Sequence, residues 1–222
     1  SNKAELTVKQ VLSHYGRLKA WIPFYMGTLD STKLPSIEYY RHKKSNMFSI
    51  NVADNLYLRK DYKDSILDII VNADQRPRRG YKYSDLSYYL FKDYIEDHYQ
   101  SDLNELTQEH FYKSMGASRM TYLPRDKFAL EQIIPTEIDD YYRNQLVHGY
   151  VHDMGAAMQG GIGGHAGLFA NSNDIAKMMQ MYLQEGFYGG KRYFNPETIK
   201  KFNHRYYSHY LVRKGVGFDK PQ

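Results

Sequence analysis

The segment NDIAKMMQMYLQEG, from Asn173 to Gly186, carries the clearest structural signal in the sequence. Its apolar residues recur at the i, i+3, i+4, i+7, i+8 spacing of one helix face, and they are Ile175, Met178, Met179, Tyr182 and Leu183. Asn173 is a typical N-cap residue, and Gly186 is a typical helix-ending residue. The spacing therefore predicts a helix that packs this face into a core, and such a stripe does not indicate a cofactor site.

Four other segments begin with helix-capping residues. Their start signals are Thr7 with Gln10, Ser84 or Asp85, Ser101-Asp102, and Asn195-Pro196. Residues 20–79 contain Pro and Gly stops, so they are predicted to be a loop-rich connection with a short strand or hairpin in MFSINVADNLYLRK, residues 47–60. The expected fold class is therefore mainly α.

The composition argues against several classes of function. The net charge of +5 arises from Lys and Arg scattered among acids, with the densest basic run at Arg76–Arg79. Because no nucleic-acid-binding motif accompanies that run, we predict no nucleic-acid partner. The sequence has no cysteine, which excludes disulfides, thiolate nucleophiles and Cys-ligated zinc. No apolar run approaches the ~18 residues that span a bilayer, and Ser1-Asn2 resembles a pair left by cloning.

Glycines are concentrated between Gly149 and Asp174. The centre of this segment, GGIGGHAG, has neither the Lys of a phosphate-binding loop nor a hydrophobic strand before it, so no nucleotide or other cofactor is predicted. We expect the glycines to permit a tight backbone path beside a cleft.

Histidines in and before this segment raise the question of a metal site. His148 and His152 are four residues apart, but Gly149 disfavours the helix that would bring them together, and no His-Glu-x-x-His pattern is present. We therefore predict no metal site. These histidines, with Asp153 and His165, are expected to hydrogen-bond loop backbone.

Catalytic carboxylates and serine nucleophiles are the remaining patterns. Asp139-Asp140 lies near Arg143 and is interpreted as a solvated helix face rather than a catalytic pair. A serine activated by a lysine one helical turn away has the pattern Ser-x-x-Lys. None of the serines in this sequence is followed by lysine at that spacing.

Four stretches resemble the serine β-lactamase and penicillin-binding-protein-like superfamily, in its β-lactamase-related esterase and D-aminopeptidase branch. LTVKQVLSHYGRL is similar to that family's lTvrqLLtHtSGL, with Tyr15-Gly16-Arg17 in place of Thr-Ser-Gly. The others are YKYSDLSYYLFKDYIE, FYKSMGASRMTYLP and GYVHDMGAAMQGGIGGHAGLFANSND. The similarity runs from about Leu6 to Phe218, and the last stretch resembles the group fused behind family 3 glycoside hydrolases in exported bacterial proteins.

The resemblance implies one part of an active site. Tyr83 matches the tyrosine of the family's Tyr-x-Asn motif, which lies near the nucleophile and helps to move its proton, and Asp85 stands where Asn is common. His165 matches the family's GHAGLFS loop and is expected at the rim of the substrate cleft. From composition alone, Tyr83 would be interpreted as one more structural aromatic in a chain with 23 tyrosines.

The resemblance also implies that residues 1–222 form a single partial β-lactamase-like domain. Residues 1–5 are expected to be a tag or linker, residues 6–80 a helix and loop-rich segment, and residues 81–222 a helical segment with the Gly-rich cleft loop. The chain would then be the helical part of a β-lactamase/transpeptidase-like α/β fold, with the main sheet strands largely outside it. The Ser-x-x-Lys helix and the His/Lys-x-Gly strand would also lie outside it.

The leading functional hypothesis is a segment of a serine hydrolase that cleaves amide or ester bonds, including cell-wall-derived ones, through an acyl-enzyme, and that is inactive alone. It implies a small-molecule or peptide substrate, a glycoside hydrolase domain in the parent protein, no membrane span, and a periplasmic or exported location. The alternative is a non-catalytic module that binds cell-wall peptide or glycan.

Overall fold

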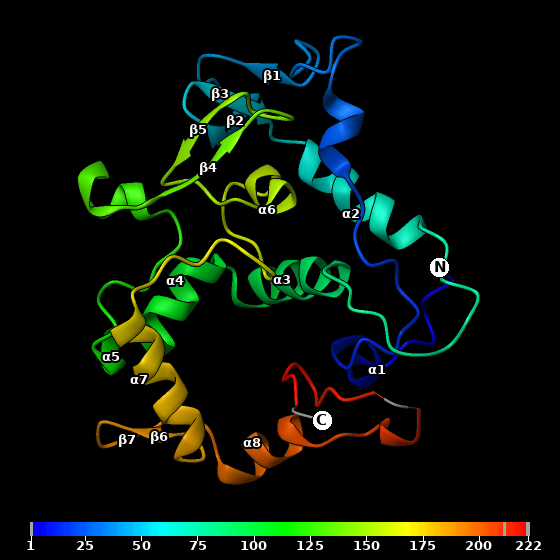
Figure 1. Cartoon of the computed structure of the whole chain (residues 1–222), viewed down its shortest axis with the longest axis vertical. Coiled ribbons are helices and arrows are strands. Elements are labelled where there is room, and N and C mark those ends of the chain that lie inside the picture. Colours follow the sequence, from blue (N-terminus) through cyan, green and yellow to red (C-terminus); the bar gives the residue numbers. More distant parts are fainter. Residues whose placement is uncertain (1, 211, 221–222) are drawn as a thin grey trace.

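The computed structural model describes residues 2–210 and 212–220 (Figure 1). The α-helices are α1 (Val8–Leu12), α2 (Tyr62–Asn72), α3 (Leu86–Tyr99), α4 (Leu103–Thr107), α5 (Lys113–Met115), α6 (Met154–Met158), α7 (Ser172–Leu183) and α8 (Pro196–Asn203). The strands are β1 (Tyr40–Arg41), β2 (Phe48–Ala53), β3 (Leu56–Arg59), β4 (Pro135–Asp139), β5 (Gln145–His148), β6 (Phe187–Tyr188) and β7 (Lys191–Arg192). Helices hold 38% of the residues and strands 13%, so helix is more frequent than strand but does not make up most of the structure.

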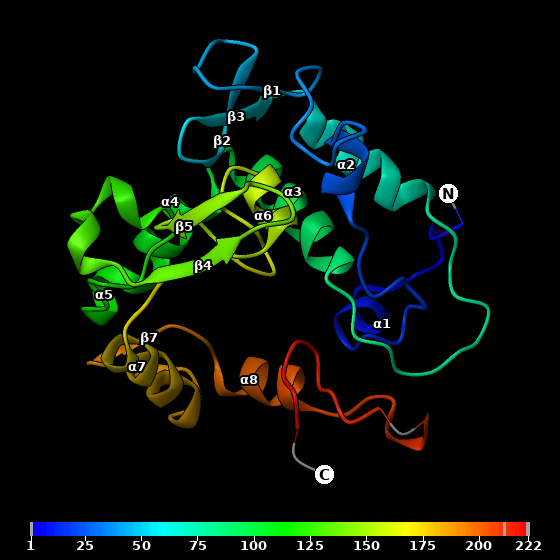
Figure 2. The same ribbon diagram turned by 45° about the horizontal axis from the view of Figure 1, so that its top comes forward.

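In the described residues, the strands form three small antiparallel sheets. The largest sheet has the strand order β1-β3-β2. The other two sheets are the hairpins β4-β5 and β6-β7. The hairpin predicted in residues 47–60 is confirmed as β2 and β3. Figure 2 shows β1 to β3 at one end of the molecule, α8 with the C-terminal segment at the other, and β4 and β5 between them.

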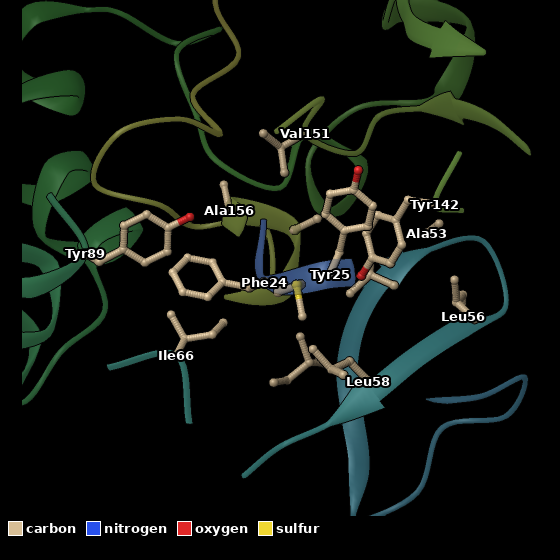
Figure 3. Packing of buried hydrophobic residues seen from close by; sticks show 14 of the residues in the cluster. Phe24, Tyr25, Ala53, Leu56, Leu58, Ile66, Tyr89, Tyr142, Val151 and Ala156 are labelled. Carbon is tan, nitrogen blue, oxygen red and sulfur yellow. The ribbon is translucent and has the colours of Figure 1, made fainter. Parts of the chain in front are cut away.

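The main core lies between the β1-β3-β2 sheet and helices α2, α3 and α6. Phe24 and Tyr25 from a short 3-10 helix (Phe24–Thr28) fill its centre, beside Leu58 of β3 and Tyr89 of α3 (Figure 3). Helix α2 was missed in the sequence, where residues 20–79 were expected to be mostly loop. It buries only Ile66 and Ile70, one turn apart, and such a narrow apolar face gives a weak periodic signal.

Local helix signals are largely confirmed. Thr7 and Gln10 form the expected capping box on α1, because the Gln10 backbone N–H donates to Thr7 Oγ1 and the Thr7 backbone N–H donates to Gln10 Oε1. Asp102 caps α4 by accepting from the backbone N–H of Glu105, and Pro196 occupies the first turn of α8. After α4 the chain continues through a π-helical stretch (Gln108–Tyr112) into α5.

Helix α7 departs from the prediction in two ways. Its N-cap is Asn171, whose side chain accepts from the Asp174 backbone N–H, two residues before the expected cap. The predicted apolar face is buried only in part, because Met178 and Tyr182 pack against a core cluster whereas Ile175, Met179 and Leu183 are 46%, 48% and 78% exposed. The helix buries Met181 in that cluster, the second and smaller of the two, whose other members are Tyr112, Met115, Ala117 and Met120.

The Asp139-Asp140 pair is not on a solvated helix face, and that interpretation was wrong. Asp139 ends β4 and is fully buried with Arg143, which donates to it from Nε at 2.6 Å. The Arg143 guanidinium also donates to Glu137 Oε1 at 2.8 Å and to the carbonyl of Val151 at 2.7 Å. The hairpin turn brings these charges together inside the protein, which a helix-based reading could not foresee. Among residues 2–210 and 212–220, no helix is both long and apolar enough to cross a membrane.

Candidate active site

Tyr83 lies on the loop that leads into α3, and segments distant in sequence meet around it. The centre of the Tyr83 ring is 4.5 Å from the centre of the His14 ring. It is 5.0 Å from Lys214 Nζ. The side chain is 45% exposed, so the hydroxyl can be reached by a ligand. The fold therefore gathers a tyrosine, a histidine and a lysine at the start of α3.

His14 is held rigidly beside Tyr83. It is buried, its backbone is left-handed with φ 54°, and its Nδ1 accepts from the Ser84 backbone N–H at 3.2 Å. Burial, with help from the positive charge of Lys214, lowers the pKa of His14 to about 4, so the imidazole is neutral at physiological pH. Sequence reasoning missed this residue, although the histidine in lTvrqLLtHtSGL was a signal for it.

The electrostatics of Tyr83 favour a protonated hydroxyl. Burial and the nearby Asp85 carboxylate raise the pKa of Tyr83 to about 12. Burial also raises the pKa of Asp85, while the positive influence of His165 opposes that rise. In this arrangement Tyr83 is a hydrogen-bond donor, and it could become a base only if another cation came closer than Lys214.

Behind Asp85 lies a second polar cluster that contains His165. His165 Nε2 is 2.8 Å from Asp153 Oδ1, which also accepts from the Ala156 backbone N–H and so caps α6. The His165 ring stacks on Tyr89, with the centres 4.4 Å apart. Because the His165 side chain is only 2% exposed, we expect it to act by orienting Asp153 rather than by touching a substrate.

A narrow cleft runs beneath the first turn of α3. Its walls include Trp21, Tyr25, Asp85, Tyr89, Asp153 and Gly155. Asp85 lines this cleft and lies two residues after the exposed Tyr83. His165 is not one of the residues that line the cleft. The Gly-rich segment does run beside a cleft, as the sequence indicated.

The histidines that the sequence singled out take different partners. His148 Nε2 is 2.5 Å from the carbonyl oxygen of Ile133, which is the predicted contact with loop backbone. His152 instead pairs with Glu137, with 3.0 Å between Nδ1 and Oε1. Within the described part of the chain, no group of three or more His, Cys, Asp or Glu side chains is arranged to hold a metal ion.

The hydroxyl of Ser114 contacts a lysine ammonium group. Ser114 Oγ of α5 accepts from Lys191 Nζ at 3.1 Å and lies 2.9 Å from the hydroxyl oxygen of Tyr193. Ser114 and Lys191 are exposed, and α5 and β7 lie together at the lower left of Figure 1. This contact is unrelated to the Ser-x-x-Lys spacing, and its role can be tested by labelling.

The chain was compared with protein-family models, curated proteins and solved structures. No family model matches the chain. A protein of Escherichia coli K12 named "Putative D-alanyl-D-alanine carboxypeptidase" is 35% identical over 165 residues, which cover 68% of this chain and 38% of that protein. The chain therefore spans well under half the length of this relative.

Solved structures agree on the fold. D-amino acid amidase from Ochrobactrum anthropi SV3 superposes with a TM-score of 0.55 at 12% identity, over 90% of this chain and 48% of that one. The penicillin-binding protein homologue from Pyrococcus abyssi superposes with a TM-score of 0.50 at 14% identity, over 91% of this chain and 41% of that one. In fold the chain is therefore similar to the serine β-lactamase and penicillin-binding-protein-like superfamily, and its curated relatives carry the name "Putative D-alanyl-D-alanine carboxypeptidase".

Proposed function

We propose that the chain is a segment of a serine hydrolase that cleaves amide or ester bonds through an acyl-enzyme. The observation that carries the proposal is the position of Tyr83, exposed at the start of α3 between His14 and Lys214. A hydroxyl held on a rigid helix start can exchange a proton with a serine and its leaving group. The 35% identity to the E. coli relative supports the reaction class.

Each residue of the site has a proposed role. Tyr83 is the proton-relay group, and Asp85, in place of the family's Asn, accepts hydrogen bonds from a substrate amide. His165 is a positioning residue that orients Asp153 at the edge of the cleft. The serine nucleophile and its lysine would come from a Ser-x-x-Lys helix in a longer polypeptide, because this sequence has no serine at that spacing.

We further propose that the chain alone is inactive and forms one partial domain whose main sheet strands belong to the rest of the parent protein. The substrate class we favour is a cell-wall-derived peptide or a related ester. That substrate implies a periplasmic or exported parent, in which a glycoside hydrolase domain would precede this one.

Covalent labelling tests the proposal. The chain and a longer polypeptide carrying Ser-x-x-Lys are each treated with fluorescent penicillin and with a fluorophosphonate, and the adduct is measured by intact mass. We expect one adduct on the longer polypeptide and none on the chain. If the chain is labelled, Ser114→Ala decides whether the exposed Ser114 is responsible. An unlabelled longer polypeptide that still binds cell-wall peptide would favour the non-catalytic binding module.

A further inference from the structure

The cleft beneath α3 combines acids with aromatic walls. Asp85 and Asp153 line it together with Trp21, Tyr25 and Tyr89. Its volume of about 20 Å³ has room for one group the size of a water molecule. The space is therefore a pocket for a single small head group and cannot enclose a larger ligand.

The Tyr89 hydroxyl is the unusual group in this cleft. Tyr89 is only 4% exposed, and within the described residues its hydroxyl forms no hydrogen bond and is not among the fully buried unpartnered polar atoms, so it is open to a group in the cleft. Figure 3 shows the hydroxyl pointing toward Ala156 of α6. A methyl group placed on Gly155, in the cleft wall, would lie 1.7 Å from the hydroxyl oxygen and 3.3 Å from Asp153 Oδ1. The hydroxyl thus faces the cleft close to Asp153.

The acids of the cleft have spare acceptor capacity. Asp153 Oδ1 accepts from Ala156 and contacts His165, whereas Oδ2 has no hydrogen-bond partner in the described part of the chain. Asp85 forms no ion pair with lysine or arginine in that part of the chain. Its negative charge acts on both Asp153 and Tyr89. The two carboxylates are only partly buried, but because they share one cleft with no lysine or arginine partner among the described residues, a positively charged donor would complement them.

We propose that this cleft binds one primary ammonium group, inserted between Asp85, Asp153 and the Tyr89 hydroxyl. An ammonium group has three donors, which suits two carboxylates and a phenol oxygen. Aromatic rings such as Trp21 and Tyr25 add cation–π attraction. Trp21 is 55% exposed, so it stands where the cleft opens to solvent. The proposal concerns amine recognition and does not depend on the hydrolase activity proposed above.

Trp21 provides a direct readout, because it is the only tryptophan in the sequence and lines the cleft. Its fluorescence, excited selectively over tyrosine, is followed while ethylammonium chloride is added to the chain at constant ionic strength. Sodium chloride and tetramethylammonium chloride serve as ligand controls, because the first lacks N–H donors and the second is too large for the cleft. We expect a saturable change with ethylammonium alone.

Variants then assign the response to the cleft. Asp85→Asn should weaken ethylammonium binding by about 10- to 100-fold, because it removes a charge-assisted contact, and Tyr89→Phe by about 5-fold, because it removes a neutral one. Asp97→Asn, an exposed acid on the same helix, should bind like the original chain. Circular dichroism checks that each variant is folded. The absence of saturation, an equal response to sodium or tetramethylammonium, or unchanged binding in both Asp85→Asn and Tyr89→Phe would overturn the assignment.

Discussion

Replacing Arg143 with methionine should destabilise the protein strongly. The Arg143 and Asp139 side chains are both 0% exposed, and the guanidinium also serves Glu137 and the carbonyls of Val151 and His152. Arg143→Met keeps most of the side-chain volume but leaves the Asp139 carboxylate buried without its cation. Removing one partner of a buried ion pair costs about 3–5 kcal/mol in the free energy of unfolding. For a chain of this size that corresponds to a Tm lower by roughly 6–20 °C.

Urea unfolding followed by circular dichroism measures this loss, with Arg125→Met as the matched control. Arg125 pairs with Asp54 at 2.7 Å, but both side chains are substantially exposed, so its loss should cost at most about 1 kcal/mol. Equal losses of stability in the two variants would refute the reasoning. They would mean that burial does not determine how much the Arg143 ion pair contributes to the free energy of unfolding.

The Asp139–Arg143 pair should make the stability of the fold depend on pH. Burial alone would raise the pKa of Asp139, but hydrogen bonds from Arg143 and from the Tyr142 backbone N–H lower it below its ordinary value. A lowered carboxylate pKa stabilises the fold above the unfolded value of about 3.9, and this contribution is lost as the pH falls through the folded value. The difference in stability between the original chain and Arg143→Met should therefore shrink below about pH 4.

Three further predictions concern the site. In the longer polypeptide that carries Ser-x-x-Lys, Tyr83→Phe should lower kcat/KM on a responsive ester by roughly 10²–10⁴ with little change in Tm, and unchanged turnover would exclude the proton-relay role. His14, with its pKa lowered to about 4, should make the chain lose stability as the pH falls from about 6.5 to 4, because the unfolded state binds the proton more readily, and His14→Gln should flatten that part of the stability curve. Gly155→Ala should destabilise the chain because its methyl group would lie 1.7 Å from the Tyr89 hydroxyl, and adding Tyr89→Phe should restore part of the loss in a double-mutant cycle of melting temperatures.

The sequence predicted best what is decided locally. The capping box of Thr7 and the helix after Asp85 follow from neighbouring residues, and both are present. The buried face of α7 could not be predicted in the same way, since it depends on which surface Met181 meets in the second cluster. The burial of Asp139 likewise depends on a hairpin partner that comes later in the chain.

For the site, the motif YKYSDLSYYLFKDYIE identified Tyr83 and Asp85 as candidate residues. The surroundings were not predictable, because His14 and Lys214 reach Tyr83 from distant parts of the chain. Spacing within one segment carries no information about such contacts. The neutral state of His14 follows only from its burial, which is a property of the folded protein.

The second cluster makes part of the molecule sensitive to oxidants. A chain without cysteine directs oxidative damage to methionine, and Met115, Met120 and Met181 form most of the packing under α7. A sulfoxide there would place a polar oxygen among apolar side chains, whereas the exposed Met179 could be oxidised with little effect. Oxidation of these methionines should therefore loosen α7 and the β6-β7 hairpin, whereas the main core around Tyr89 has fewer methionines to lose, with Met158 buried in it and Met154 packed against it.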